Sequence, residues 1–156
     1  MTLYRPEAFE PLTDAAWDEG HVRGAIEAIA ANAQRTFDAK RLWPATEEWD
    51  SAGAQLPLTT LHTGASGVTW ALHELAERGH ADVRLDLRNA ARRAVEAWRE
   101  APDFAERHQP PVRTHASLFF GETGALLVAC KLAPTRELAD DLHTRVGRTR
   151  TTRRTS

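Results

Sequence analysis

Two glycine pairs with the same internal spacing, 57 residues apart, are the feature that most constrains how this chain can fold. Each pair precedes an apolar run, and further residues match at the same offset. The matching residues are Gly64 with Gly121, Gly67 with Gly124, Leu61 with Leu118, Leu75 with Leu132, and Ala76 with Ala133. Each unit therefore combines a glycine turn, an apolar inner helix, a short link and an amphipathic outer helix. Such a unit cannot bury its apolar helix alone and must stack beside copies of itself.

Hydrophobic periodicity predicts five helices, and period-two alternation never persists, so the fold class is all-α. The first helix is expected to be capped by Thr13, with one buried stripe. Its stripe is expected to comprise Trp17, Ile26, Ile29, Ala30, Ala33 and Phe37. The second is predicted to follow Gly67 and to end at Gly79, and the third to begin near Asp82 as N-cap.

The fourth helix is predicted from about Glu122 to Leu132 and is apolar nearly all round. The fifth is expected to start at Thr135, with Leu138, Ala139, Leu142 and Val146 as its stripe. The polar face of the third helix is interpreted as a solvated surface formed by Arg84, Arg88, Arg92, Arg93, Glu96, Arg99 and Glu100. The segment 41–60, which has two prolines and no periodicity, is expected to be a long connection.

The glycine pairs themselves have two interpretations. In the structural one, glycine allows a positive φ and a close backbone approach where each inner helix begins. In the functional one, the N-terminal amides of the helix bind an anion. The lysine and Ser/Thr of a phosphate loop are missing. The structural interpretation is therefore favoured, and Gly64, Gly67, Gly121 and Gly124 are assigned as structural repeat markers.

Composition excludes several classes of protein. A formal net charge of −2 gives no reason to expect nucleic acid or a membrane surface as partner. Cys130 is the single cysteine, so no intrachain disulfide is possible and a reducing compartment is expected. The first residues contain no apolar core of signal-peptide length, and no run approaches a membrane span. A cytoplasmic, soluble protein is expected.

The segments "LHTGASGVTWALHELAERGHADVRLDLRNAARRAVEAWREAPDF" and "SLFFGETGALLVACKLAPTRELADDL" resemble the amino-terminal part of lanthionine synthetase C-like proteins. The resemblance covers roughly residues 15–143 and includes the preceding "LWP". It implies an (α/α) toroid, here an incomplete one of about two glycine-led helix pairs plus an N-terminal helix. It also implies zinc-dependent addition of a peptide cysteine to a dehydroamino acid, which closes a thioether ring; relatives use glutathione as the thiol.

The same resemblance implies a zinc site made by two cysteines and a histidine, in a Trp-Cys-containing motif and a Cys-His-Gly motif of later repeats. This chain contains neither motif. No catalytic, cofactor-binding or metal-binding residue is therefore assigned, and no cofactor is expected in this fragment. Whether the chain is an enzyme stays open. Cys130 and His73 occupy equivalent positions in the two units, but zinc needs three or four ligands.

Other polar and aromatic residues are read as structural. The remaining histidines lack a partner motif: His21, His62, His80, His108, His115 and His143. "HELAERGH" does not have the HExxH spacing of metalloproteases. Glu47, Glu48 and Asp50 are interpreted as a solvated loop cluster rather than paired catalytic carboxylates. The five tryptophans could line a sugar-binding face, as in carbohydrate-processing toroids, and stand at positions 17, 43, 49, 70 and 98.

Two domains are expected: the toroid part, 1–143, and a disordered Arg/Thr-rich tail, 144–156. From Arg145 onward there are five arginines and no acid. The tail is either a basic contact for an acidic partner or nucleic acid, or the product of a lost reading frame. The second alternative is favoured, because the resemblance given above stops near His143, close to where the composition changes. An incomplete toroid leaves inner helices uncovered, which predicts self-association through exposed apolar residues. Those expected on this patch are Leu126, Leu127, Leu132, Leu72 and Val68.

Three hypotheses about function follow. The first is a truncated lanthionine synthetase C-like protein that does not catalyse thiol addition alone. The second is a non-catalytic binding or assembly module whose ring is completed by another chain. The third is a carbohydrate-related α/α toroid. The expected partners are a peptide substrate or a completing protein chain, without nucleic acid or membrane.

Overall fold

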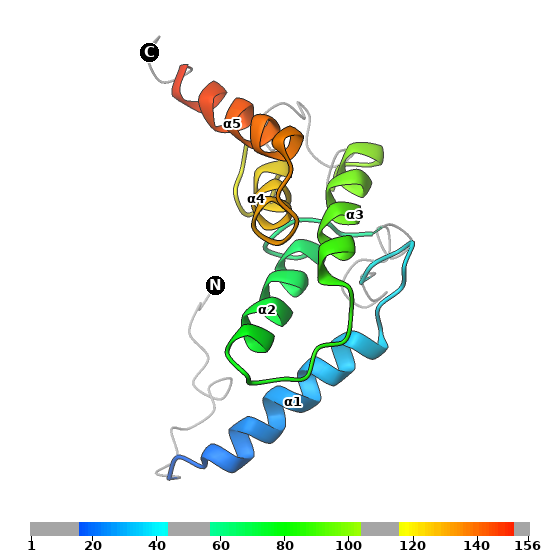
Figure 1. The fold of residues 1–156 in the computed structure, drawn as a ribbon, viewed down its shortest axis with the longest axis vertical. Helices are drawn as coiled ribbons and strands as arrows, with labels where there is room; N and C mark the ends of the chain where they lie inside the picture. The colour runs from blue at the N-terminus through cyan, green and yellow to red at the C-terminus, as the bar shows by residue number, and fades with distance from the viewer. Residues whose placement is uncertain (1–15, 44–56, 104–115, 152–156) are drawn as a thin grey trace, which may run out of the picture.

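The computed structural model describes residues 16–43, 57–103 and 116–151, which form five helices and no strand within those ranges. The helices are α1 (Glu19–Arg35), α2 (Ala65–Glu77), α3 (Leu87–Glu100), α4 (Glu122–Leu132) and α5 (Arg136–Thr151). The predicted all-α class is confirmed for these residues. Two helix pairs, α2 with α3 and α4 with α5, lie next to one another, and α1 runs obliquely past the link that connects α2 to α3 (Figure 1).

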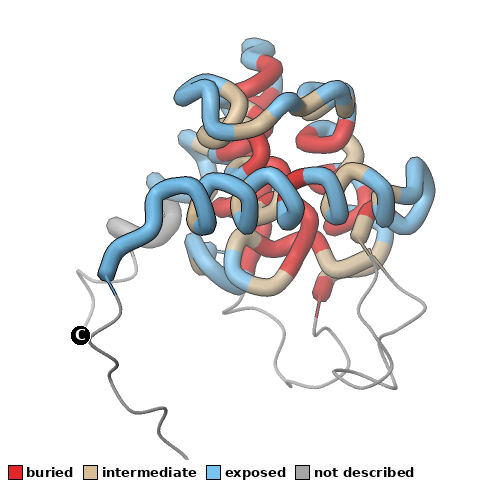
Figure 2. The backbone as a smooth tube through the Cα atoms, turned by 90° about the horizontal axis from the view of Figure 1, so that it is seen from below, coloured by how far each residue is buried: buried red, intermediate tan, exposed pale blue. Residues whose placement is uncertain are grey.

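We call residues 58–100 unit 1 and residues 116–151 unit 2. The main core lies where α3, α4 and α5 meet, and its cluster includes Val95, Leu126, Val128 and Leu132. The alanine-rich side of α3 packs inward, and Trp98 is its largest buried side chain. Small side chains let α3 approach both α2 and α4 closely, so α3 joins the two units. Figure 2 shows this buried core behind the exposed surface of the long helix α1.

Helix α1 differs from its prediction. Asp18, not Thr13, is its N-cap, and the Asp18 carboxylate accepts a hydrogen bond from the His21 amide at 2.9 Å. The predicted stripe is wrong in part, because only Ala30 is buried while Trp17 and Ile29 are exposed. Thr13 itself lies outside the described residues.

Helix α1 is fastened at its C-terminal end. The Gln34 amide donates to the Asp82 carbonyl at 2.9 Å and accepts from the Arg84 amide at 2.7 Å. Leu42, buried at φ 57°, fills a second apolar cluster with Ala65 and residues of α3. A buried leucine at positive φ is strained, and its burial against α2 and α3 holds it there.

Two predicted helix starts are displaced. Helix α3 begins at Leu87 with Asp86 as N-cap, and the Asp86 carboxylate accepts from the Asn89 amide at 3.0 Å. The prediction of Asp82 is wrong because Gln34 of α1 holds residues 82–84 in a link. Helix α2 begins at Ala65 rather than after Gly67.

The other predicted boundaries agree with the structure. Helix α4 has the predicted bounds and is buried on most sides. Gly79, at φ 69°, follows the end of α2, where His80 donates to the Leu75 carbonyl as in a Schellman motif. The Thr135 hydroxyl accepts from the Leu138 amide at 3.2 Å and so starts α5.

Helix α5 continues to Thr151. The prediction that residues from 144 onward are disordered is therefore wrong for residues 144–151. In the predicted stripe, Leu138 is buried and Leu142 half-buried, whereas Ala139 and Val146 are exposed. Residues 152–156 lie outside the described part of the chain.

Candidate functional site

The four glycines of the repeat lie at the start of α2 and α4, and the N-cap glycine has a similar backbone geometry in both units. Gly64 and Gly121 are the N-caps of α2 and α4, with φ of −131° and −138°. These extended conformations are open to any residue, so the expected positive φ is wrong. What requires glycine is space. A Cβ on Gly67 would lie 2.2 Å from the Leu61 carbonyl oxygen, and one on Gly124 would lie 2.1 Å from that of Leu118.

The turn before each glycine pair is also repeated in its hydrogen bonding. In unit 1 the Thr60 hydroxyl accepts from the Thr63 amide at 3.4 Å. In unit 2 the Ser117 hydroxyl accepts from the Phe120 amide at 3.1 Å. Both contacts stand at the 57-residue offset found in the sequence. The two units therefore share backbone geometry as well as sequence pattern.

The two turns contact each other directly. The His62 amide donates to the Phe119 carbonyl at 3.0 Å. The His62 ring lies edge-on to Phe120, with centroids 4.9 Å apart. Leu61 reaches across to unit 2, where its Cβ would lie 2.8 Å from a Cβ on Gly124. The second glycine of unit 2 therefore makes room for its own turn and for the leucine of unit 1.

The amides at the start of α2 already have protein acceptors, which contradicts the anion-binding interpretation for that turn. Gly64 donates to the Thr60 carbonyl, Ala65 to the Leu58 carbonyl at 2.8 Å, and Ser66 to the Thr59 carbonyl. An anion would have to displace these backbone contacts. The glycine turn of unit 1 is a closed backbone junction.

A buried aspartate that the sequence analysis did not single out fixes the glycine turn of unit 1. The Asp103 carboxylate is 6% exposed and accepts from the Thr59 amide at 2.7 Å, the Thr59 hydroxyl at 2.9 Å and the Thr60 amide at 3.0 Å. Burial raises the pKa of Asp103, and the hydrogen bonds from Thr59 and Thr60 oppose that rise. Asp103 ties the end of α3 to the turn that starts α2.

The raised pKa of Asp103 sets the sign of a pH effect. The folded protein keeps this proton at a pH where the unfolded chain has released it, so stability falls as pH rises through the window above the ordinary value of 3.8. We expect the unfolding free energy of the wild type minus that of Asp103→Asn to increase as pH is lowered from 7 towards 4. Denaturant titrations across this range measure the difference.

Glu100→Gln is the matched control with the opposite sign. The hydrogen bond from Arg93 lowers the pKa of Glu100. The unfolding free energy of the wild type minus that of Glu100→Gln should therefore decrease as pH falls. A wild-type minus Asp103→Asn difference that is flat, or that follows the Glu100 control, would contradict the assignment.

A buried carboxylate also begins unit 2. Glu122 follows Gly121 and is 1% exposed. Its Oε1 accepts from Arg99 Nε of α3 at 3.1 Å, and its Oε2 pairs with Arg145 of α5 at 2.7 Å. Arg99 also pairs with Asp141. Arg99 is thus not simply part of a solvated face, and Arg145, at the start of the expected tail, has a structural contact.

Cys130 and His73 are not brought together into a metal site. The His73 ring lies 6.0 Å from the Trp70 ring, and Trp70 packs against the main core, as does Cys130. Within the described ranges, no group of three or more His, Cys, Asp or Glu residues is placed to hold a metal ion. Burial, with a smaller contribution from Asp141, raises the pKa of the Cys130 thiol. A raised pKa keeps the thiol protonated at neutral pH, which is the opposite of an activated nucleophile.

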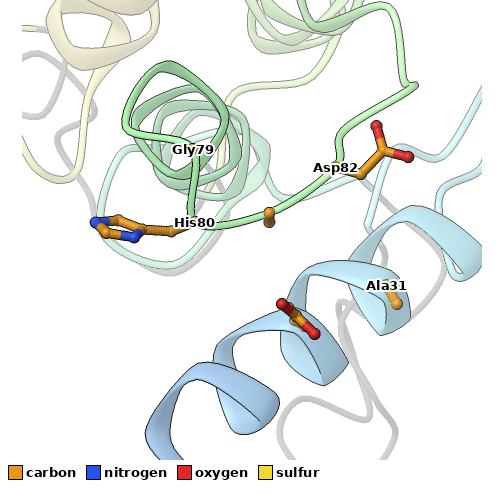
Figure 3. A pocket seen from close by; sticks show the side chains of 6 residues that line it. Ala31, Gly79, His80 and Asp82 are labelled. Carbon is orange, nitrogen blue, oxygen red and sulfur yellow. The ribbon is translucent and has the colours of Figure 1, made fainter. Parts of the chain in front are cut away.

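The remaining candidates are scattered. His80 lines a hollow of about 390 Å³ between α1 and the α2–α3 link, together with Glu27, Gly79 and Asp82 (Figure 3). His21 and His143 are exposed on α1 and α5. The candidates at His108, His115, Glu47, Glu48, Trp49 and Asp50 lie outside the described residues.

The tryptophans also occupy different environments. Trp98 is buried in the core, while Trp43 lies against Phe37 with tilted rings, centroids 5.0 Å apart, and donates to the Ala33 carbonyl at 2.7 Å. Trp70 is half-buried and Trp17 is exposed. Trp98 and Trp43 therefore serve packing rather than a sugar-binding face.

The patch residues expected to be exposed are corrected by the structure. Leu126, Leu132 and Leu72 are buried, Val68 is half-buried, and Leu127 alone among the five is exposed. Helices α3 and α5 both pack against α4 and cover most of it. The large apolar residues exposed on unit 2 include Leu118, Phe119, Phe120 and Leu127.

Comparison of the chain with protein-family models, with curated proteins and with solved structures gives no match. No helix among the described residues is long and apolar enough to cross a membrane.

Proposed function

We propose that this chain is a scaffold section of an (α/α) toroid of the lanthionine synthetase C-like kind, and that it does not catalyse thiol addition by itself. The observation that carries the proposal is the repeated glycine turn. In both units the second glycine lies under the carbonyl of the leucine six residues earlier, and the turns of the two units touch. This junction places successive inner helices side by side, as a toroid requires.

The polar groups of the described residues favour scaffold over catalysis. Asp103 and Glu122 are the buried carboxylates at the two turns, and each is held by protein donors or arginines. Both serve to fix a turn or to join helices. A thiol-addition enzyme needs a thiolate, which zinc generates by stabilising the deprotonated sulfur. The described residues do not fit a zinc site, and Cys130 has a raised pKa.

A reconstitution experiment tests the scaffold function. The substrate is a peptide with one cysteine and one dehydroalanine. Ring closure consumes the thiol, so it is measured by mass spectrometry as a loss of peptide that can be alkylated at cysteine. The three samples are the chain with zinc, a zinc-binding section of a lanthionine cyclase that lacks its first two repeats, and both together. We expect ring closure only in the third sample.

Two results would contradict the proposal. Turnover by the chain with zinc alone would make it an enzyme rather than a scaffold. If the chain does not increase turnover by the zinc-binding section, the proposal that it is a scaffold section of such a toroid is wrong. A Gly124→Ala variant, which should disrupt the glycine junction, is the matched negative control.

A second candidate, an assembly module, is favoured by the exposed apolar residues of unit 2. Phe119 is 54% exposed and Leu127 is 44% exposed. Exposed apolar side chains gathered on one unit are typical of a protein interface. This candidate is compatible with the first, because a scaffold section also needs neighbours.

A further inference from the structure

The contact between unit 1 and unit 2 uses two different faces. Unit 1 contributes Leu61, which lies beside Gly124, and Trp70, which packs against the main core with Lys131 Nζ 5.8 Å from its ring centroid. We call this the leading face. Unit 2 contributes the side of α4 that contains Val128 and Leu132, both in the cluster on which Leu61 and Trp70 pack. We call this the receiving face.

The 57-residue offset identifies the same two faces on the other unit. The leading face of unit 2 consists of Leu118 and Leu127, which match Leu61 and Trp70. Leu118 is 40% exposed and Leu127 is 44% exposed. Unit 2 therefore has a leading face that no neighbouring unit of this chain covers within the described residues.

Unit 1 has the complementary face, which no other described residue covers fully. Its receiving face consists of Ala71 and Leu75, the matches of Val128 and Leu132, with Gly67 in the place of Gly124. Val128 and Leu132 are buried, whereas Ala71 is exposed and Leu75 and Gly67 are half-buried. An open apolar hollow lies here, lined by Trp70, Ala71, Glu74, Leu75 and Arg78. Helix α4 packs against α2 and α3 of unit 1 and against its own α5, whereas α2 packs against α3 and α4.

We propose that a second copy of this chain docks head to tail, with the leading face of one copy on the receiving face of the next. Leu118 of the first copy then lies against Gly67 of the second copy, as Leu61 lies against Gly124 within one chain. Leu127 of the first copy enters the hollow beside Ala71 of the second. The proposal rests on the repeat scaffold proposed above and names its partner. Because the two faces differ, the interface is heterologous and builds a ring or an open chain of copies.

The charges predict what holds this interface. Between units 1 and 2, Lys131 lies over the ring of Trp70. The matching pair between copies is Glu74 with Leu127, which has no cation–π contact. Burial of apolar surface is thus the main contribution, and association should be insensitive to moderate salt.

Complementation of two single variants tests the direction of docking. Leu127→Asp damages the leading face and Ala71→Arg damages the receiving face. Sedimentation velocity over a concentration series should show assemblies larger than a dimer for the wild type. Each variant alone should associate at least about tenfold more weakly, since a charge is placed in an apolar interface. An equimolar mixture should form a dimer and nothing larger, because one intact pair of faces remains.

Controls separate docking from folding. Ile29→Asp changes an exposed side chain of α1, on neither face, and should leave assembly unchanged. Leu118→Asp provides a second leading-face variant should Leu127→Asp unfold, and circular dichroism reports the fold of each. A monomeric wild type at the highest soluble concentration overturns the proposal. So does a mixture that stays monomeric, which indicates a symmetric or different interface. If copies do not associate but the chain still supports ring closure by a zinc-binding section, the proposed scaffold function stands and the proposed docking of a second copy is wrong.

Discussion

Gly124→Ala is expected to lower the free energy of unfolding by about 3 kcal/mol or more, the upper end of ordinary overpacking costs. The added Cβ would lie 2.1 Å from the Leu118 carbonyl oxygen and 2.8 Å from Leu61 Cβ. The first of these neighbours is backbone and cannot rotate away. Helix α4 would have to move from its turn, in the best-packed part of the protein. Urea unfolding followed by helical circular dichroism measures the change.

Gly24→Ala is the matched control. Gly24 lies inside α1, and a Cβ there would have no heavy atom within 4 Å. Alanine forms helix better than glycine, so this variant should stabilise the protein by up to about 1 kcal/mol, or leave it unchanged where α1 unfolds separately. If both variants change stability equally, the close approach at Gly124 is not what requires glycine.

Glu122→Gln is expected to lower the free energy of unfolding by about 2 kcal/mol. The carboxylate is buried and pairs with Arg99 of α3 and Arg145 of α5. Removing its charge leaves two guanidinium groups facing a neutral amide. The cost should stay below that of a fully buried pair, because both arginines are partly exposed and can turn to water. Thermal and urea unfolding both report the loss.

Glu96→Gln is the control for the loss of one acid on a helix. Glu96 lies on the exposed side of α3, 3.6 Å from Arg93, and its replacement should change stability by less than about 0.5 kcal/mol. Equal effects of the two substitutions would mean that the Glu122 cluster does not join the helices. Arg145→Met should reproduce part of the Glu122 effect, which tests the contact with α5 directly.

The fold was predictable where signals are local and repeated. The apolar run of α4 is bounded by Gly121 and Pro134, so both ends of this helix were placed correctly. The end of α2 was marked by Gly79, which takes the positive φ that glycine tolerates best. The start of α3 was predicted wrongly at Asp82, since Asp86 is its N-cap. The side chain of Gln34, about fifty residues away, bonds to the backbone of Asp82 and Arg84 and holds this segment in a link.

The candidate site was predictable only in part. The repeat drew attention to the right glycines, but the expected positive φ was wrong, because the distance to a carbonyl six residues earlier is not visible in a residue pattern. Asp103 was missed because its partners, Thr59 and Thr60, are 44 and 43 residues away in the chain. Glu122 was missed because an acid in the first turn of a helix is ordinary on a surface, and nothing local indicates burial.

The sequence by itself determined the helical class, the pairing of an apolar with an amphipathic helix, and the 57-residue repeat. These depend on period and spacing along the chain, which the residue order contains directly. The tertiary structure alone decided which carboxylates are buried, which cap begins α3, and which faces remain open. Those outcomes depend on contacts between distant segments, such as Leu61 with Gly124, where burial changes the meaning of a side chain.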